Sequence, residues 1–423
     1  ASLPPVSSDI HRTIEAVWRI ESTKVIAAIS RLVRDVGLAE ELAQDSFVAA
    51  LEQWPQSGIP DRPAAWLMRT AKNKAIDRIR RNVTLENKRA VLARDAELGE
   101  IDDPDWDTAL DDPVGDDILR LMFIACHPVL SMEARVALTL RLLGGLTTAE
   151  IARGFLAPEP TIAQRIVRAK RTLAKKQVPF ATPPAEELTE RLSSVLEVIY
   201  LIFNEGYSAS SGESWLRTDL CFEALRLGRI LVGVAPNEPE AHGLLALMEL
   251  QASRFRTRVD AEGNPVRLPD QDRRRWDRLH IKRGLAALDR ARSLASEPDF
   301  YLLQAEIAAC HARARTFEET DWKEIVRLYD ELAFRFPSPV VELNRAVAVG
   351  MADGPEAGLE LVETLAKEPL LRDNHLLISV RADLLEKAGR LEEARAEFAR
   401  AAELTLNEAE RRLLEARAEQ PPL

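Results

Sequence analysis

Apolar residues recur at every third or fourth position along most of the chain, a spacing that predicts α-helices. The first predicted helix begins near Ile10 and ends at Gly37, and a second covers residues 38–51. A proline- and glycine-rich loop over 55–63 leads to a third helix over 65–81. The strict apolar–polar alternation of strands is missing, so the sequence predicts an all-α protein.

Composition divides this helical pattern into four segments. Helices over 9–90 predict a small bundle, and helices over 115–178 predict a second small domain. Residues 91–114 form an acidic linker, because like charges and prolines disfavour a packed core. Helical periodicity returns over 185–423, beginning with an apolar helix that must be buried.

The C-terminal segment contains repeats. Near residues 375–401 and 344–359, small residues stand at tetratricopeptide spacing, where paired helices would touch. Earlier pairs, 220–231 with 241–250 and 281–294 with 301–312, are consistent but degenerate. Stacked helix pairs form an α-solenoid, and the concave face of a solenoid usually binds protein or peptide.

Charge is distributed unevenly along the chain. Residues 69–89 contain eight basic and two acidic side chains, and residues 165–176 contain six basic and no acidic ones. Between them, residues 95–117 contain eleven acidic and no basic side chains. Two basic stripes separated by an acidic segment say more about partners than the net charge of −11.

The helix over 65–81 combines an apolar seam with a cationic face. Neutralised phosphates release counterions, so this face fits nucleic-acid binding, while a solvated face on an ordinary amphipathic helix is the alternative. Asn73 adds an amide that can read a base edge, and Trp66 adds a ring that can stack on an unpaired base. The residues of the apolar seam are Leu67, Ala71, Ala75 and Ile79.

A helix-turn-helix is predicted over 146–173. Thr147 and Glu150 have the spacing of a capping box at the start of its first helix. Pro158 and Pro160 then break the chain, and a second helix follows, although many helical hairpins share this pattern. The apolar residues of the second helix are Ile162, Ile166, Ala169 and Leu173, and its candidate major-groove contacts are Thr161, Gln164, Arg165, Arg168, Lys170 and Arg171.

The sequence gives little support for a metal site, a catalytic nucleophile or a membrane span. The three cysteines lie far apart without zinc-site spacing, and Cys126-His127 is better explained by core packing, so we expect a reduced, cytoplasmic protein without metal or cofactor. The segment 206–210 misses the last glycine of a GxSxG elbow and follows no strand, so a helix-connecting loop is preferred to a hydrolase nucleophile. No apolar run approaches the length of a membrane span.

Two charged segments leave alternatives open. The acidic linker is either a solvated spacer or a strand that mimics a nucleic acid in a cationic channel of a partner. Residues 254–277 form a charged loop that breaks the repeat pattern. The run 270–277 within it is expected to be a solvated, ion-paired surface, and a second interpretation places its basic part against the acidic linker.

Three motifs in this order support a resemblance to a known family. They are the run from Asp35 to Phe47, the helix from Trp66 to Arg81, and the helix-turn-helix over 146–170. Residues 9–82 and 115–178 resemble regions 2 and 4 of bacterial RNA polymerase sigma factors of the extracytoplasmic-function (ECF) type. The remaining C-terminal residues are similar to the tetratricopeptide-like extension of the long ECF subgroup.

The resemblance implies roles for individual residues. Core RNA polymerase, through its β′ clamp helices and β subunit, would be one partner, with contacts at Leu38, Glu41, Gln44, Asp45 and Phe47. Promoter DNA would be the other, with the melted −10 element held by Trp66, Arg69, Lys72, Asn73, Arg80 and Arg81. Asn73 would line the pocket for an extruded base. The six candidate groove contacts would read the −35 element, although Ala163-Gln164 departs from the Lys/Arg-Ser pair of many relatives. The linker would thread toward the active-site cleft of polymerase.

Three classes of function compete. An enzyme needs polar groups that converge on a pocket, and no catalytic constellation emerges. A helix-turn-helix regulator with a solenoid sensor would explain residues 115–423 but would leave 38–81 without a role. A sigma factor accounts for both basic helices, their order and the linker. We therefore predict a non-enzymatic sigma factor whose solenoid regulates activity and binds a regulatory protein or peptide.

Overall fold

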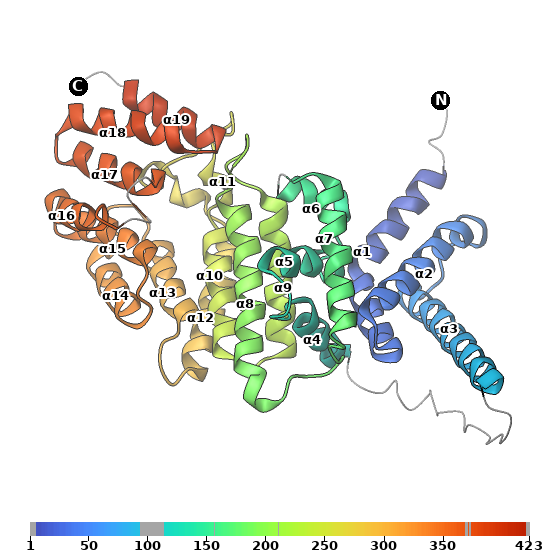
Figure 1. Cartoon of the computed structure of the whole chain (residues 1–423). Helices are drawn as coiled ribbons and strands as arrows, with labels where there is room; N and C mark the ends of the chain where they lie inside the picture. Colours follow the sequence, from blue (N-terminus) through green and yellow to red (C-terminus); the bar gives the residue numbers. More distant parts are fainter. Residues whose placement is uncertain are drawn as a thin grey trace, which may run out of the picture. The chain divides into compact units, whose positions relative to one another are not determined.

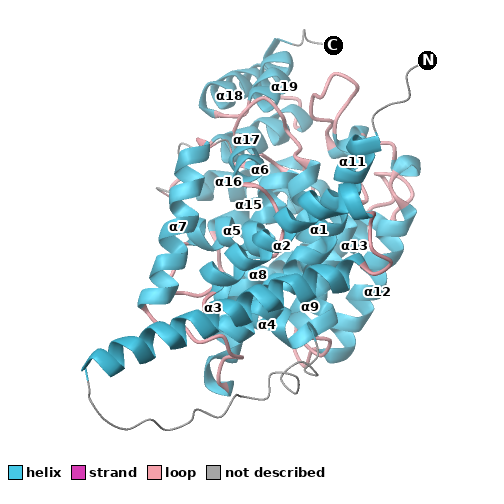
Figure 2. Cartoon of the chain, turned by 90° about the vertical axis from the view of Figure 1, so that its right-hand side faces the viewer, coloured by secondary structure: helices cyan, strands magenta, loops and turns pink. Residues whose placement is uncertain are grey.

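All named secondary-structure elements in the described residues are helices. The computed structural model describes residues 6–93, 114–155, 157–209, 211–368, 371 and 374–419. Within these residues, β pairing is limited to two isolated bridges, Gly212 with Asn407 and Val259 with Pro265. The prediction of an all-α protein is therefore confirmed (Figure 1, Figure 2). The chain divides into two compact units, residues 1–198 and residues 199–423.

The first unit begins with three packed helices, α1 (Val6–Val33), α2 (Val36–Ser57) and α3 (Pro63–Ala93). Each contributes one apolar stripe to a shared core, because burial of such a stripe removes its surface from water. The fully buried residues of this core include Ile14, Val25, Ile26, Ile29, Ala43, Trp54, Leu67, Ala71 and Ala75. The predicted seam of the third helix is thus confirmed at three of its positions, while Ile79 is half-buried.

The junction between α1 and α2 differs from the prediction. α1 ends at Val33, and Arg34 adopts a left-handed backbone conformation with φ of 53°. The side chain of Asp35 then caps α2 by accepting a hydrogen bond from the Leu38 N–H at 2.9 Å. The predicted helix end at Gly37 was wrong, because Gly37 lies inside the first turn of α2. α2 also continues through Pro55, so the loop to α3 is shorter than predicted.

The second half of this unit contains α4 (Val114–Ala125), α5 (Met132–Leu142), α6 (Thr148–Gly154) and α7 (Glu159–Lys175). The capping box is confirmed: the Glu150 N–H donates to the Thr147 hydroxyl at 3.1 Å, and the Thr147 N–H donates to the Glu150 carboxylate at 2.7 Å. The apolar face of α7 is buried as predicted, through Ile162, Ile166, Ala169 and Leu173. Helices α6 and α7 together form the helix-turn-helix.

The next helix, α8 (Ala185–Tyr207), contributes residues to both units. In the first unit, Arg191 donates to the Phe123 carbonyl at 2.5 Å and Ser194 donates to the Cys126 carbonyl at 2.6 Å. These bonds satisfy carbonyl groups at the end of α4, where a helix has no internal donors left. The N-terminal half of α8 therefore packs against the helix-turn-helix domain.

The second unit continues as a series of helices, most of which form pairs. Its further helices are α9 (Thr218–Val234), α10 (Pro239–Ala252), α11 (Phe255–Arg258), α12 (Arg278–Leu294), α13 (Phe300–Arg313), α14 (Trp322–Arg335), α15 (Pro339–Ala352), α16 (Pro355–Leu365), α17 (His375–Lys387), α18 (Leu391–Leu404) and α19 (Glu408–Glu419). The pairs predicted from the repeats correspond to α9 with α10, α12 with α13, α15 with α16, and α17 with α18. α14 was not predicted.

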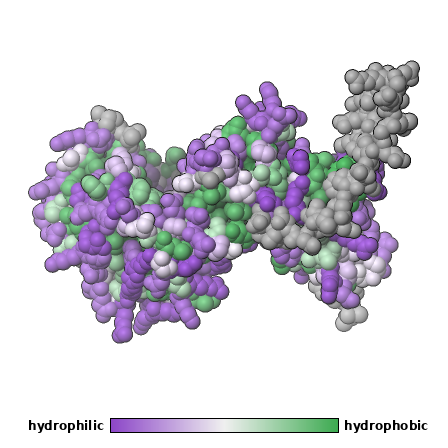
Figure 3. Space-filling model, turned by 90° about the horizontal axis from the view of Figure 1, so that it is seen from below, coloured by the Kyte–Doolittle hydropathy of each residue, from purple (hydrophilic) through white to green (hydrophobic). Residues whose placement is uncertain are grey.

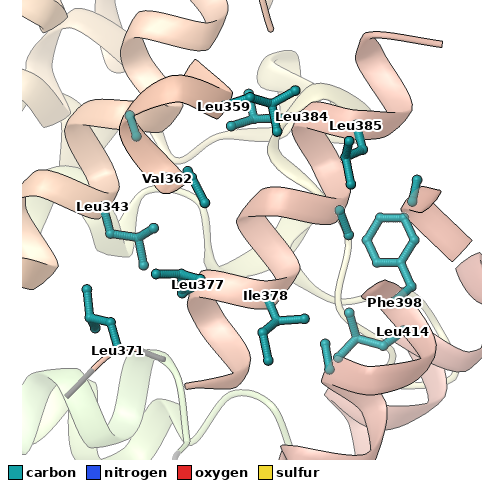
Figure 4. Packing of buried hydrophobic residues seen from close by; sticks show 14 of the residues in the cluster. Leu343, Leu359, Val362, Leu371, Leu377, Ile378, Leu384, Leu385, Phe398 and Leu414 are labelled. Carbon is teal, nitrogen blue, oxygen red and sulfur yellow. The ribbon is translucent and has the colours of Figure 1, made fainter. Parts of the chain in front are cut away.

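Small residues allow these helices to approach closely. A methyl group at Gly358 of α16 would lie 2.9 Å from the backbone oxygen of Ala346 in α15, which is too close for a carbon atom. Farther along, Leu359, Leu377 and Phe398 belong to one continuous apolar core built by α15 to α19 (Figure 4). Hydrophilic residues cover much of the outer surface (Figure 3).

The run 270–277 of the charged loop is more buried than predicted. Arg273 is only 5% exposed and donates hydrogen bonds to the carbonyls of His311 and Ala314 and to the Thr320 hydroxyl. Trp276 is 3% exposed, and the Arg273 guanidinium lies 5.0 Å from its ring centroid. The interpretation of this run as a solvated surface was therefore wrong at its centre, because both side chains anchor the loop to the helices.

Candidate nucleic-acid and polymerase interface

The cationic face of α3 is open to solvent. Arg69, Asn73 and Arg81 are exposed, as is Arg80, and Lys72 is half-buried. The opposite seam, with Leu67 at 1% exposure, fixes the rotation of the helix and hence the direction of this face. A positive face carrying one exposed amide can hold phosphates and contact a base. The structure therefore presents these −10 candidates together on one side of a helix.

Trp66 is held by a partner that the sequence interpretation missed. Its ring meets the ring of Trp54 edge to face, with centroids 5.3 Å apart and an interplanar angle of 71°. Trp54 is 1% exposed and belongs to the last part of α2, which had been predicted as the approach to a loop. The spacing of Leu51 and Trp54, three residues apart on one helix face, was the available signal. Trp66 is half-buried and oriented by this contact.

The candidate polymerase contacts lie along the outer side of α2. Glu41 and Asp45 are exposed, while Leu38, Gln44 and Phe47 are half-buried. Phe47 stacks on Trp18 of α1, with ring centroids 5.0 Å apart. Trp18 was not among the predicted contacts, although it forms part of the same surface.

A groove of about 680 Å³ opens beside this surface. Its lining includes Trp18, Gln44, Phe47 and the exposed Val48 from the first three-helix group. Exposed apolar and aromatic side chains in a hollow, with polar groups at its margin, are typical of a protein-binding site. The helix-turn-helix domain contributes Arg141, Gly145, Thr147 and Glu150 to the lining.

The candidate −35 contacts project from α7. Thr161, Gln164, Arg168 and Arg171 are exposed, and Arg165 is half-buried, so five of the six face solvent at least in part. The sixth, Lys170, is also half-buried, and it forms an ion pair with Glu40 of α2. The structure thus connects one predicted DNA contact with the helix that carries the predicted polymerase contacts.

Glu40 was missed by the sequence interpretation. Its side chain is 5% exposed and accepts hydrogen bonds from Arg141 Nε at 2.6 Å and from Gln44 Nε2 at 2.7 Å, besides the pair with Lys170. A carboxylate so far out of water requires paired cations. Its position beside the exposed Glu41 gave no signal that it is buried.

The acidic segment can be followed only at its end, because residues 94–113 lie outside the described residues. Asp117, counted with this segment, belongs to α4 and is 2% exposed. It pairs with Arg120 at 2.9 Å and with Arg31 of α1 at 3.5 Å. The last acid of the run is therefore a structural residue and no part of a spacer.

The cysteine and serine candidates are structural. Burial raises the pKa of the Cys126 thiol to about 11, and burial lowers the pKa of its neighbour His127 to about 4. In the segment 206–210, Gly206 and Tyr207 form the end of helix α8, and a methyl group at Gly206 would lie 2.8 Å from the backbone N of Cys221. A nucleophile elbow needs a strand before the serine, so its geometry is not formed here. Among the described residues, no helix is long and apolar enough to cross a membrane.

Comparison with known proteins agrees with this geometry. Residues 19–84 match sigma-70 region 2, residues 120–173 match sigma-70 region 4, and residues 191–292 match a family of unknown function. An uncharacterized protein of Rhizobium meliloti is 45% identical, over 92% of this chain and 90% of its own length.

Relatives that carry functional names match a shorter part of the chain. The ECF RNA polymerase sigma factor SigK of Mycolicibacterium vanbaalenii is 31% identical, over 36% of this chain and 75% of SigK. The probable ECF RNA polymerase sigma factor SigI of Mycobacterium tuberculosis is 26% identical, over 42% of this chain and 59% of SigI. No solved structure matches the chain.

Proposed function

Because the chain belongs to the ECF family of RNA polymerase sigma factors, we propose which of its surfaces carry out the tasks of such a factor. The protein directs promoter-specific transcription initiation, with core RNA polymerase and promoter DNA as its partners. The family is not an enzyme family. We place its action in the cytoplasm, where core polymerase and promoter DNA are found.

The proposal assigns polymerase binding, −10 recognition and −35 recognition to three different surfaces. The groove beside Phe47 and the outer side of α2 bind the β′ clamp helices, and the helix-turn-helix domain adds contacts to the β subunit. The cationic face of α3 captures the melted −10 element, with Asn73 in contact with an extruded base. The exposed face of α7 reads the −35 element.

One observation carries the assignment. Helices α3 and α7 each have a cationic face opposite a buried apolar face. The residues predicted to bind polymerase lie on a third, partly apolar surface. A transcriptional regulator that only binds duplex DNA would use α7 and would have no task for the groove beside Phe47. The sigma-factor assignment uses all three surfaces.

Run-off transcription tests the function directly. The purified chain is added to core polymerase and a promoter library, and initiation at a subset of promoters is the expected result. A chain that binds duplex DNA without polymerase and only reduces transcription would contradict the assignment. A variant with Asp61→Asn, an exposed residue in the loop between α2 and α3 and outside the three surfaces, is the matched control and should initiate like the parent chain.

The C-terminal unit is proposed to regulate this activity. Its support is a helix-pair fold of the kind that binds protein or peptide, fused directly behind the helix-turn-helix domain. Removal of residues 209–423, which leaves α8 in place, should change promoter output. A truncation after Lys176 would also remove the Arg191 and Ser194 contacts to α4, so it is the less specific variant. Identical transcription by the full and the shortened chain would exclude a regulatory role.

A further inference from the structure

Helix α12 of the second unit and the loop before it carry a concentration of positive charge that none of the three proposed surfaces uses. Residues 199–423 contain 39 acidic and 31 basic side chains, yet residues 273–283 contain six basic side chains and one acidic side chain. Concentrated charge of one sign raises the local concentration of oppositely charged partners. Five exposed cations define this basic patch: Arg256, Arg275, Arg278, Lys282 and Arg283.

The packing of α12 determines which of its side chains face the solvent. The helix lies against α10 and α13, and its buried stripe includes Gly284 and Leu288 (Figure 1). A methyl group at Gly284 would lie 2.7 Å from the Leu250 side chain, so α10 and α12 are in close contact along this stripe. Arg278 and Lys282, four positions apart, are neighbours on the solvent side of the helix. The fold therefore holds the cations of the patch outward as a group.

The cations of the patch are not neutralised by neighbouring acids. Within the described part of the chain, none of the five forms an ion pair, whereas Arg274 beside them pairs with Asp272. Asp277, the one acid of residues 273–283, caps the start of α12. Hydrogen bonds from the N–H groups there are the main reason that the pKa of Asp277 is lowered, and the charge of Arg256 contributes less. The positive charges of the patch are therefore available to a partner.

Three further arginines in the loop before α12 add to the positive potential. The Arg258 guanidinium lies 3.6 Å from the Tyr207 ring centroid and donates to the Tyr207 carbonyl. Arg254 and Arg273 lie 5.4 Å and 5.0 Å from the ring centroid of Trp276. Burial lowers the pKa of Arg254, and the charges of Arg258 and Arg273 lower it further. Carbonyls and rings hold these side chains without cancelling their charge, because a guanidinium stays protonated in a protein.

The composition of the patch indicates which polyanion it binds. Protein interfaces are enriched in aromatic residues and depleted of lysine, and single-stranded nucleic acids are bound by stacking on exposed rings. The other exposed side chains near these cations on α12 are Leu279 and Ala286, and the nearby Trp276 is 3% exposed. Arginine and lysine without a stacking ring suit the phosphates of duplex DNA, and phosphate contacts position a protein without specifying a sequence.

We propose that the basic patch is a third DNA contact, which binds the phosphate backbone of the duplex upstream of the −35 element without reading its sequence. This inference rests on the proposed function, which brings promoter DNA to α3 and α7. The N-terminal half of α8 packs against the helix-turn-helix domain, and the same helix continues into the second unit. DNA held by α7 is therefore present at a high effective concentration for the patch. The second unit thus contributes to promoter affinity directly, beyond the binding of a regulatory protein or peptide.

Two promoter fragments test the patch in the complex of the full chain with core polymerase. The promoter is one that initiates in the run-off library. One fragment ends at the −35 element, and the other extends upstream by about 20 base pairs, or roughly 70 Å of duplex. Fluorescence anisotropy should show that the parent binds the extended fragment about threefold or more tightly than the short one. The variant Arg278→Gln/Lys282→Gln/Arg283→Gln should lose most of this gain.

Two more variants make the test specific. Lys323→Gln/Arg327→Gln/Arg335→Gln removes the same amount of charge from exposed positions on α14 and should keep the gain from the extension. Arg256→Gln/Arg275→Gln alters the patch on the loop before α12 and should reduce the gain. This second patch variant covers the case in which the α12 variant fails to fold, which circular dichroism detects.

The salt dependence of binding counts the phosphate contacts. Each lost contact lowers the slope of log affinity against log salt concentration by roughly 0.9, so the α12 variant should lower the slope on the extended fragment by about 2–3. A gain from the extension that survives in both patch variants would overturn the proposal. Patch variants that lose affinity for core polymerase and keep the gain would also overturn it, because the patch would then bind protein.

The outcome is separable from the proposed function. Failure of the parent chain to initiate transcription with core polymerase would refute the sigma-factor surfaces, and the third contact with them, because no promoter would then be brought to the patch. Normal initiation by a parent chain that gains nothing from the upstream duplex would refute the third contact alone.

Discussion

Asn407 offers a sharp test of how the C-terminal unit is closed. Its side chain is 1% exposed and forms bonds in two directions. The amide nitrogen donates to the carbonyls of Ala209 at 3.0 Å and Ser214 at 3.1 Å, in a loop 198 and 193 residues earlier in the chain. The amide oxygen caps α19 by accepting from the N–H groups of Ala409 and Glu410.

The substitution Asn407→Asp separates these two functions, because a carboxylate still caps the helix but cannot donate. The buried carbonyl of Ala209 then loses its partner, at about 1–3 kcal/mol. The carbonyl of the exposed Ser214 loses less, because water can replace the missing donor. The negative charge at the start of α19 stabilises the helix by roughly 0.3–1 kcal/mol, which offsets part of this loss. The buried Glu410 carboxylate lies in the same turn and adds repulsion. We expect a net loss of about 1–3 kcal/mol in the free energy of unfolding.

Urea unfolding of the full chain, followed by circular dichroism, measures this loss. Asn374 is the matched control: its side chain also caps a helix, by accepting from the Leu376 N–H at 2.8 Å, and no donation from its amide is seen among the described contacts. Asn374→Asp should change stability by no more than about 0.5 kcal/mol. If the two variants unfold at the same urea concentration, the bonds from Asn407 to the loop do not hold the unit together.

Three further predictions concern the site and the second unit. Asn73→Ala should impair promoter opening more than core binding, because it removes the proposed base contact and leaves α2 intact; equal open-complex yield in permanganate footprinting would discard that role. Phe47→Ala should weaken binding to core polymerase by about tenfold or more, as expected for an aromatic side chain that becomes buried at an interface, and unchanged affinity in a pull-down titration against Asp61→Ala would place the docking surface elsewhere. Burial, with the nearby charges of Arg254 and Arg273, lowers the pKa of His311 to about 3, so the fold favours its neutral form and the associated stability is lost as pH falls from about 6.5 toward 3. His311→Phe should flatten this slope, which is at most about 1.4 kcal/mol per pH unit, and an unaltered slope in acid titrations of stability would contradict it.

The sequence predicted the regular helices and the two charged faces well. Apolar spacing located the seam of Leu67, Ala71 and Ala75, and the same spacing located the buried face of α7, since helical period alone determines which residues share a face. The capping box at Thr147 and Glu150 was also predictable, because it depends on two residues three positions apart. These features are local in sequence.

Features that depend on distant partners could not be predicted. Glu40 resembles its neighbour Glu41 in sequence, and only the approach of Arg141 and Lys170 makes it a buried ion. Arg273 reads as one of three arginines in a solvated run, yet it is buried because carbonyls of α13 and the following loop lie within reach. α1 ends before Arg34, which adopts a left-handed conformation although it is not glycine. The side chain of Asp35 caps α2 directly after it and so determines where the second helix begins. The roles assigned to the DNA and polymerase contacts remain predictions.

The continuous helix α8 limits how this protein can be recombined with its relatives. Residues such as Ser194 and Phe203, nine positions apart on one helix, serve the cores of different halves. A chimera joined between the sigma regions and the extension would need to inherit α8 whole, with Phe123 and Cys126 compatible at one end and the aromatic residues around Phe203 at the other. Exchange of extensions among such factors, whether by gene shuffling or in the laboratory, should therefore succeed most often where the crossover point falls outside this helix.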